Sequence, residues 1–270
     1  MSAIDELFQR LRRERRKALM PFVTAGAPHL DFTAEALRRL DARGAHLFEV
    51  GFPYSDPIAD GPVIQASYTQ ALERGVTVSG IFDMAGGVLS DLAAPAVAMV
   101  SYAIVFRRGL ERFIAEAKGA GFAGAIVPDL PIEEAAELKA ICDRHDFSLV
   151  QLVTPTTPRD RAVRIAEASS GFVYYVSVAG ITGERDELPP ELIDNVAWLR
   201  EQTELPICIG FGISRGEHVQ RLAPIADGLI VGSAIVRRIA TAEDRPRDDV
   251  LREVDEFVGE LLAALSSNPR

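Results

Sequence analysis

The sequence is poor in the side chains that carry out covalent catalysis. Only three of its 270 residues are lysines, namely Lys17, Lys118 and Lys139. Lys17 precedes the first predicted strand and the other two lie within predicted helices, so none is expected at an active site. This placement argues against Schiff-base chemistry. Neither a G-x-S-x-G motif nor a Cys-His pairing is present, which argues against acyl transfer.

Metal ligands and cofactor motifs are equally scarce. The four histidines lie far apart, at positions 29, 46, 145 and 218, and lack the H-x-x-x-H spacing of a metal site. Cys142 and Cys208 form no C-x-x-C motif, so both are expected to be reduced packing residues of a cytoplasmic protein. No dinucleotide-binding fingerprint is found. The sequence therefore predicts chemistry that uses neither a metal nor a cofactor held by this chain.

The sequence also lacks an excess of positive charge and lacks long apolar runs. The formal net charge is −10 and the isoelectric point is about 5.0, which argues against a nucleic-acid-binding surface. The sequence contains no run of 18 or more apolar residues, so no membrane span is predicted. The first residues lack the apolar core of a signal peptide. These features predict a cytoplasmic protein.

What the sequence does contain is an alternation of short apolar segments with amphipathic ones. The predicted strands are residues 18–24, 47–51, 96–101, 124–127, 148–153, 172–177, 206–209 and 227–231. Several of them are apolar throughout, as is typical of parallel strands covered on both faces. Between the strands, residues 32–43, 109–120 and 131–142 show helical spacing of apolar residues, the last segment beginning at Pro131.

About eight β-then-α units of this kind predict an α/β fold, a (β/α)8 TIM barrel. A doubly wound open sheet is the alternative. No linker divides the chain, so residues 1–270 are expected to form one domain, with an extra N-terminal helix covering the barrel floor. Active sites of such barrels lie at the carboxyl ends of the strands.

Three carboxylates lie in or just after the second predicted strand. Glu49 lies near the end of this apolar segment, and Asp56 and Asp60 lie in the loop after it. Both aspartates also suit turns, in Ser-Asp-Pro and Asp-Gly. Glu49 has no turn to make, and burial would raise its pKa towards the range of acid–base catalysis.

Glycine turns at the last three strand ends predict a phosphate site. They are Gly180-Ile181-Thr182-Gly183, Gly210-Phe211-Gly212 and Gly232-Ser233-Ala234. Backbone N–H groups at such turns bind anions, and a short helix capped by Ser233 is expected after the eighth strand. Apolar residues at the barrel mouth would suit a flat aromatic group, although core packing explains about half of them equally well. They are Phe22, Val100, Tyr102, Val127, Tyr174, Phe211 and Ile230.

Taken together, these motifs resemble the tryptophan synthase alpha subunit family. The matching segments, in chain order, are Pro21-Phe22-Val23-Thr24-Ala25-Gly26, Glu49-Val50-Gly51, Tyr54-Ser55-Asp56-Pro57, Ala59-Asp60-Gly61-Pro62, Val127-Pro128-Asp129-Leu130-Pro131, Gly180-Ile181-Thr182-Gly183, Gly210-Phe211-Gly212-Ile213-Ser214 and Asp227-Gly228 followed by Val231-Gly232-Ser233-Ala234-Ile235-Val236. They cover nearly the whole chain. The segment from Glu49 to Pro62 is the most specific of them.

The resemblance implies a lyase of tryptophan biosynthesis that cleaves indole-3-glycerol phosphate to indole and glyceraldehyde 3-phosphate. It implies that Glu49 protonates C3 of the indole and takes the proton of the glycerol hydroxyl beside the broken bond. Asp60 would stabilise the positive charge on the indole ring. The further implied site residues are Tyr174 facing the substrate, Thr182 positioning Asp60 from a lid at about 178–190, and Gly183, Gly212, Gly232 and Ser233 at the phosphate.

The resemblance also implies a partner, a pyridoxal-phosphate β subunit that receives the indole in an α2β2 assembly. Asp56 matches a loop residue at that interface. Two positions depart from the family pattern. Ile104 replaces an Asn that is common in the family, near the loop that faces the β subunit, and this change affects the expected contact with that subunit. Phe52 replaces a small aliphatic residue and is expected to add bulk to the pocket wall beside Glu49.

Three other functions stay open from the sequence. Ile104 is compatible with a stand-alone lyase that releases free indole without a partner. A different phosphate-binding barrel, such as a sugar-phosphate isomerase, fits the Glu49-to-Pro62 segment and the apolar mouth less well. A non-catalytic scaffolding barrel would have no use for Glu49 and Asp60.

Overall fold

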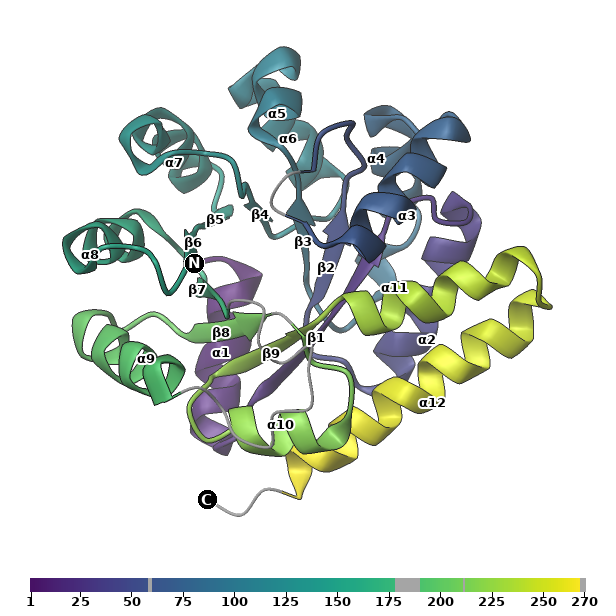
Figure 1. The fold of residues 1–270 in the computed structure, drawn as a ribbon. Helices are drawn as coiled ribbons and strands as arrows, with labels where there is room; N and C mark the ends of the chain where they lie inside the picture. Colours follow the sequence, from purple (N-terminus) through teal and green to yellow (C-terminus); the bar gives the residue numbers. More distant parts are fainter. Residues whose placement is uncertain (58–59, 178–189, 211, 268–270) are drawn as a thin grey trace.

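The computed structural model describes residues 1–57, 60–177, 190–210 and 212–267. Its centre is one sheet of nine parallel strands in the order β5-β4-β3-β2-β1-β9-β8-β7-β6. The strands are β1 (Ala18–Thr24), β2 (Phe48–Gly51), β3 (Ala96–Met99), β4 (Gly124–Ile126), β5 (Ser148–Val150), β6 (Leu152–Val153), β7 (Val173–Val176), β8 (Ile207–Gly210) and β9 (Gly228–Val231). Figure 1 shows them at the centre, with most helices around them in chain order.

The sheet closes on itself through Gln151. This residue separates β5, which pairs with β4, from β6, which pairs with β7. The carbonyl of Gln151 accepts a hydrogen bond from the N–H of Tyr174 at 3.1 Å, so the ladder to β7 begins there. β5 and β6 are therefore two halves of one bent strand, and the sheet is the predicted eight-stranded barrel rather than an open sheet.

The helices cover the outside and the floor of the barrel. They are α1 (Ala3–Glu14), α2 (Leu30–Arg43), α3 (Pro62–Glu73), α4 (Val78–Gly86), α5 (Tyr102–Arg108), α6 (Leu110–Gly119), α7 (Ala135–Arg144), α8 (Arg159–Ala168), α9 (Pro190–Gln202), α10 (Gly216–Leu222), α11 (Ser233–Ala240) and α12 (Arg247–Ser266). Three short 3₁₀ helices are Leu89–Asp91, Ile132–Glu134 and Thr241–Glu243. Among the described residues, no helix has the length and hydrophobicity needed to cross a membrane.

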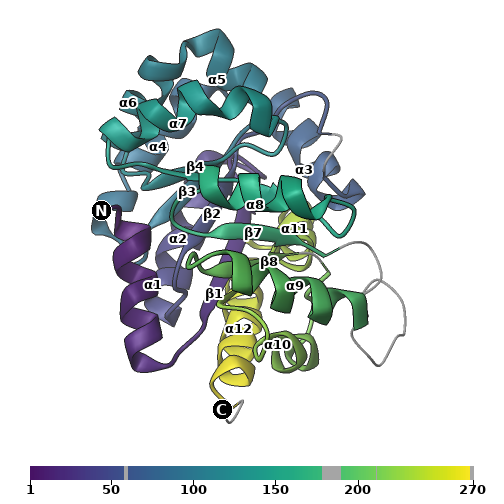
Figure 2. The ribbon, with the colours of Figure 1, turned by 90° about the vertical axis from the view of Figure 1, so that its left-hand side faces the viewer.

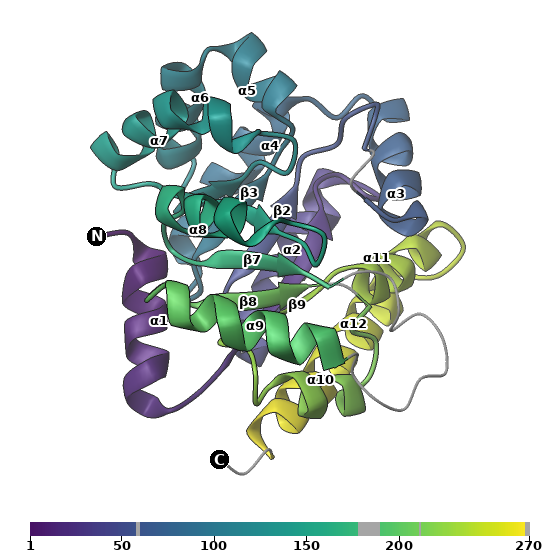
Figure 3. The same cartoon turned by 60° about the vertical axis from the view of Figure 1, so that its left-hand side comes forward.

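The N-terminal helix α1 forms the barrel floor, as predicted. Ser2 and Asp5 make a reciprocal capping box that starts the helix. Its buried face, with Leu7, Phe8 and Leu11, belongs to one apolar cluster with residues from inside the barrel. Figure 2 and Figure 3 show α1 at one end of the strands, whereas α3 and α11 lie at the other. The second end is therefore free to hold a ligand.

Two predicted helix starts differ in detail from the structure. The segment after Pro131 first makes a 3₁₀ turn, and the α-helix begins only at Ala135. Ser233 is not the cap of the helix after β9, because it is already the first helical residue and Gly232 precedes it as the N-cap. The predicted strand 18–24 has the observed bounds, and 206–209 is shifted by one residue from β8. Five other predicted strands are longer than the observed ones by one or two residues, since ladder pairing stops where the chain turns into its loop.

Candidate active site

A cavity of about 520 Å³ opens at the carboxyl ends of the strands. Its lining contains Glu49 and Asp60 as its only carboxylates among the described residues. Apolar walls come from the strands and the loops that follow them, namely Phe22, Met99, Leu152, Tyr174, Val176, Ile213 and Ile230. The cavity is therefore mostly apolar with two acids on one side, the arrangement expected for an aromatic substrate that undergoes proton transfer.

Glu49 points into the barrel from within β2. Its residue is 1% exposed, and neither carboxyl oxygen has a hydrogen-bond partner in the described structure. Burial, and then the charge of Asp60, raises the pKa of Glu49 to about 8. Since the charged form is penalised by desolvation, Glu49 carries a proton at neutral pH and is able to give it away.

Asp60 lies in the loop between β2 and α3. Burial raises its pKa to about 6, and a 3.5 Å hydrogen bond from the Tyr54 hydroxyl lowers it again in part. Gln65 holds this loop by donating from Nε2 to the carbonyls of Asp60 at 2.8 Å and Pro57 at 3.1 Å. Between about pH 6 and 8 one acid is thus protonated and the other ionised, a division of roles typical of paired catalytic carboxyls.

Backbone and cationic groups gather on the other side of the cavity. Ser233 and Ala234 border it from the first turn of α11, where N–H groups have no intrahelical acceptor. Gly212 has a φ of +76°, a left-handed conformation that favours glycine. Arg215 and Arg237 also line the cavity, and Arg237 has no ionic partner within the described ranges. This side is built to receive an anion.

His218 holds the loop after β8 in place. Its Nδ1 lies 3.2 Å from the carbonyl of Gly212, and its Nε2 accepts from Nε of Arg215 at 3.0 Å. A proton on Nδ1 satisfies these two contacts, whereas an unprotonated Nδ1 accepts from the N–H of Ser214 at 3.3 Å, so the neutral ring makes one set or the other. Burial, followed by the charge of Arg215, lowers the pKa of His218, so the ring is neutral when it makes them.

The cavity unites eight of the residues predicted from the sequence. They are Phe22, Glu49, Asp60, Tyr174, Gly212, Ile230, Gly232 and Ser233. Residues outside the described part of the chain include Thr182, Gly183 and Phe211, and with them 178–189 of the lid predicted at about 178–190. Asp56 is exposed on the loop after β2, where the Ser55 hydroxyl donates to it at 3.0 Å.

Tyr102 and Phe52 do not line this cavity, contrary to the predictions for them. Tyr102 is the first residue of α5, where its N–H donates to Asp129 at 2.7 Å. Its ring centroid lies 6.1 Å from that of Phe106 on the same helix. Phe52 points out of the barrel. Its ring packs in a fully buried aromatic cluster between the sheet and the helices, with Phe82, Phe113 and Phe122. Bulk at position 52 therefore fills the outer core instead of narrowing the pocket.

Arg215, Arg237 and His218 line the cavity but were not predicted as site residues from the sequence. A usable signal existed for Arg215 and Arg237, since each follows a glycine turn of the predicted phosphate site by three to five residues. His218 gave no signal, because its contact with Gly212 depends on how α10 folds back on the loop.

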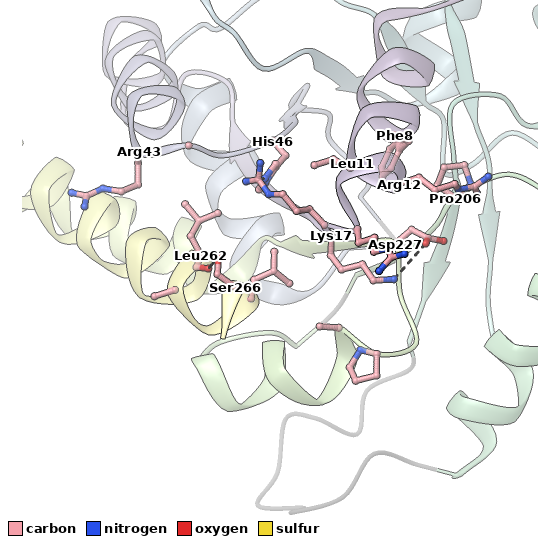
Figure 4. Close-up of a pocket in the computed structure, with 17 residues that line it drawn as sticks. Phe8, Leu11, Arg12, Lys17, Arg43, His46, Pro206, Asp227, Leu262 and Ser266 are labelled. Carbon is pink, nitrogen blue, oxygen red and sulfur yellow. Dashed lines mark hydrogen bonds and ion pairs between the residues drawn. The ribbon is translucent and has the colours of Figure 1, made fainter. Parts of the chain in front are cut away.

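A larger cleft of about 1050 Å³ lies at the barrel floor, between α1, α12 and the adjoining loops. It is lined by the cations Arg12, Arg15, Arg16, Lys17 and Arg43. Figure 4 shows Lys17 beside Asp227, to which it is joined at 3.6 Å. The other interactions are Arg12 with the carbonyl of Glu204, Arg16 with Glu14 and Arg43 with Asp255. Four of the five cations thus have partners in the protein, and size alone does not make this cleft an active site.

Comparisons with known proteins identify the family. The family model described as tryptophan synthase alpha chain matches residues 8–266. The chain is 54% identical over 271 aligned positions to the tryptophan synthase alpha chain of Rhodopirellula baltica, covering 98% of each. It superposes on tryptophan synthase subunit alpha of Legionella pneumophila with a TM-score of 0.90 at 31% identity, covering 98% of this chain and 99% of that one. A tryptophan synthase complex from Pyrococcus furiosus matches with a TM-score of 0.83 at 34% identity, covering 92% and 99%. The chain therefore belongs to the tryptophan synthase alpha chain family.

Proposed function

We propose that this chain catalyses the lyase reaction of its family, the retro-aldol cleavage of indole-3-glycerol phosphate in tryptophan biosynthesis. The observation that carries the proposal is Glu49, a fully buried carboxyl whose oxygens have no partner and whose pKa is raised to about 8. A group of this kind in an apolar cavity serves as a general acid near neutral pH. No metal or cofactor takes part within this chain.

The steps assign one role to each acid. Protonated Glu49 gives its proton to C3 of the indole, which places a positive charge on the ring. Ionised Asp60 stabilises that charge by accepting a hydrogen bond from the ring N–H. The Glu49 carboxylate then takes the proton of the adjacent glycerol hydroxyl. The C–C bond breaks, its electrons return to the ring, and indole and glyceraldehyde 3-phosphate are formed.

The remaining cavity residues bind the substrate. The backbone around Gly212, Gly232 and Ser233 receives the phosphate, and we assign Gly183 to the same group from the sequence. Phe22 from β1 and Tyr174 from β7 contact the indole, and Phe211 and Thr182 are assigned to the substrate from the sequence alone. Tyr102 keeps no substrate-binding role in this proposal, because it lies outside the cavity.

A β subunit that holds pyridoxal phosphate is the proposed partner, in an α2β2 assembly in the cytoplasm. The solved relative from Pyrococcus furiosus is part of a tryptophan synthase complex. On this chain, exposed Asp56 and the helix α5, where Phe106 is 64% exposed, offer a surface at the barrel mouth. Ile104 packs against the apolar core instead, so its departure from Asn leaves this surface free. Because all strands belong to one sheet, we propose residues 1–270 as one domain.

The direct test is to supply indole-3-glycerol phosphate to the purified chain and to measure indole, with and without a β subunit. Indole production that increases when the β subunit is added is the expected result. Absence of indole under both conditions would remove the proposed reaction. Rapid turnover that the β subunit does not change would instead favour the stand-alone lyase, which nothing in the described structure supports.

A further inference from the structure

Two tyrosines, Tyr54 and Tyr68, lie near Asp60, and the reaction described above assigns no role to either of them. Tyr54 comes from the loop after β2 and Tyr68 from α3, and their ring centroids are 5.5 Å apart. Tyr68 belongs to a small apolar cluster with Phe22 and Ile64, and Tyr54 packs against it. Neither tyrosine is among the residues that line the cavity, so any contribution to the reaction passes through a neighbouring side chain.

The hydroxyl of Tyr68 occupies the barrel interior next to Glu49. Residues 49 and 51 of β2 face the same side of the sheet, because side chains alternate along a strand. A Cβ atom at Gly51 would lie 2.7 Å from the Tyr68 hydroxyl and 2.5 Å from Cζ of Phe22. Glycine at position 51 therefore makes the space into which Tyr68 places its hydroxyl.

This hydroxyl is buried without a partner. Tyr68 is 0% exposed, and among the described residues its oxygen and both oxygens of Glu49 make no hydrogen bond. A buried polar group that stays unpaired destabilises the fold, so each such group calls for an explanation. A phenylalanine would fill the same space without that cost. The presence of the Tyr68 hydroxyl at this buried position is explained if it gains a hydrogen-bond acceptor during the reaction.

We propose that Tyr54 and Tyr68 are positioning residues that hold the Asp60 carboxylate from two sides, with the Tyr68 hydroxyl donating to it once substrate is bound. Tyr54 already donates to Oδ2 of Asp60 at 3.5 Å, a long contact that leaves room for a second donor. The inference rests on the proposed function, because it deepens the role given there to Asp60.

The electrostatics of the cluster agree with this geometry. Burial is the main reason that the pKa values of both phenols are raised, so both remain protonated and able to donate over the working pH range. The charge that most affects Tyr68 is that of Asp60, followed by Tyr54 and Glu49. Donation to the ionised form favours it, so the two tyrosines would keep Asp60 charged while Glu49 stays protonated.

Other titratable groups face this cluster from several elements. They are Tyr174 from β7, Asp129 from the loop after β4, Arg215 and His218 after β8, and Arg237 from α11. None of them changes identity in the variants below. A change in pH dependence is therefore assignable to the phenol that is removed.

The test is the pH dependence of kcat/KM for cleavage of indole-3-glycerol phosphate in Tyr68→Phe and Tyr54→Phe. Loss of a donor to Asp60 should move the acidic limb of the profile to higher pH by about one unit and leave the basic limb in place. Tyr175→Phe is the matched control. Tyr175 is similarly buried on the same sheet but belongs to the outer core cluster, so its removal should move neither limb.

The outcomes separate this inference from the proposed function. An inactive wild-type chain would overturn the proposed reaction itself. An active chain in which Tyr68→Phe lowers kcat without moving the acidic limb would show that Tyr68 only supports packing, and the inference would be wrong. A shift of the basic limb would mean that Tyr68 acts on Glu49 and not on Asp60, which also contradicts it. Circular dichroism at each pH checks that every variant is folded.

Discussion

The cavity at the barrel mouth and the cleft at the barrel floor differ in what burial does to their charges. At the mouth, burial raises the pKa of Glu49 to about 8 and leaves its oxygens without partners. At the floor, burial and the neighbouring Arg16 lower the pKa of His46 to about 4. His46 nevertheless accepts a hydrogen bond at Nδ1 from the N–H of Leu19 at 3.1 Å. Desolvation favours the neutral form in both places, but only the mouth leaves the neutral group free to react.

The two regions show that the unpaired carboxyl oxygens of Glu49 mark the reactive end of this barrel better than cavity volume does. The floor cleft has about twice the volume of the mouth cavity. Most of its cations are already bound to carboxylates or carbonyls of the protein. Substitutions at the mouth should therefore change catalysis, and substitutions at the floor should change stability.

The largest effect is expected for Glu49→Gln. An amide neither donates a proton to C3 nor accepts one from the hydroxyl, so indole release should fall by about 10³-fold or more. A variant that keeps more than a few per cent of wild-type activity would contradict the acid–base assignment. His46→Gln at the floor is the matched control, because it changes another buried titratable group and should leave turnover near that of the wild type.

The same variant should be more stable than the wild type at pH 8. The unfolded chain releases the Glu49 proton above about pH 4.5, whereas the folded chain holds it until about pH 8. The raised pKa of this acid therefore makes the wild type progressively less stable across that window. Glu49→Gln removes this loss, so urea unfolding should show a gain at pH 8 that disappears near pH 4.5. An equal gain at both values would argue against the raised pKa.

Asp60→Asn should reduce kcat by roughly 10²-fold with a smaller effect on KM. The charge of Asp60 is most useful when the indole ring becomes positive, so its loss affects the transition state more than the bound substrate. Steady-state kinetics with indole-3-glycerol phosphate measure both parameters. A variant whose main defect is a raised KM would assign Asp60 to substrate holding instead.

Gly212→Val and Gly232→Val should weaken binding of glycerol 3-phosphate by about tenfold or more. A side chain obstructs backbone approach to the phosphate at both positions, and Val is strained at the positive φ of Gly212. Calorimetric titration measures the affinity. Gly119→Ala, at the end of α6 with open space around it, provides the control for a glycine outside the cavity. Wild-type affinity in both valine variants would rule out the proposed phosphate site.

The smallest effect is expected at the floor for Lys17→Gln. It breaks a partly exposed ion pair with Asp227, which keeps a second cation in Arg200 at 2.9 Å. Such pairs contribute about 0.5 kcal/mol, so the midpoint of thermal unfolding should fall by only about 1 °C while kcat stays unchanged. A lower kcat would show that the floor communicates with the mouth and would break the contrast between them.

Some site residues were located correctly from the order and ends of the predicted strands, and others were not. Glu49 and the glycines after β8 and β9 were found from the sequence because strand order and strand ends decide where they lie. Tyr102 also follows a strand, but the chain turns into α5 there and carries the ring away from the cavity. Phe52 was misplaced for a different reason: side chains alternate along β2, so the strand that turns Glu49 and Gly51 inward turns Phe52 outward, a pattern already present in the sequence. Tyr102 shows that a position three residues beyond a strand depends on the loop that follows.

The sequence by itself determined the alternating strands and helices, the helix that covers the floor and the presence of an acid on β2, because each rests on local periodicity or on a residue and its near neighbours. Only the tertiary structure decided that the sheet closes through Gln151 and that Tyr68 fills the space left by Gly51. The tertiary structure also decided that most cations at the floor have partners in the protein, whereas the Glu49 carboxyl at the mouth has none. Pairing and desolvation depend on side chains that are distant in sequence, and these meet only when the barrel closes.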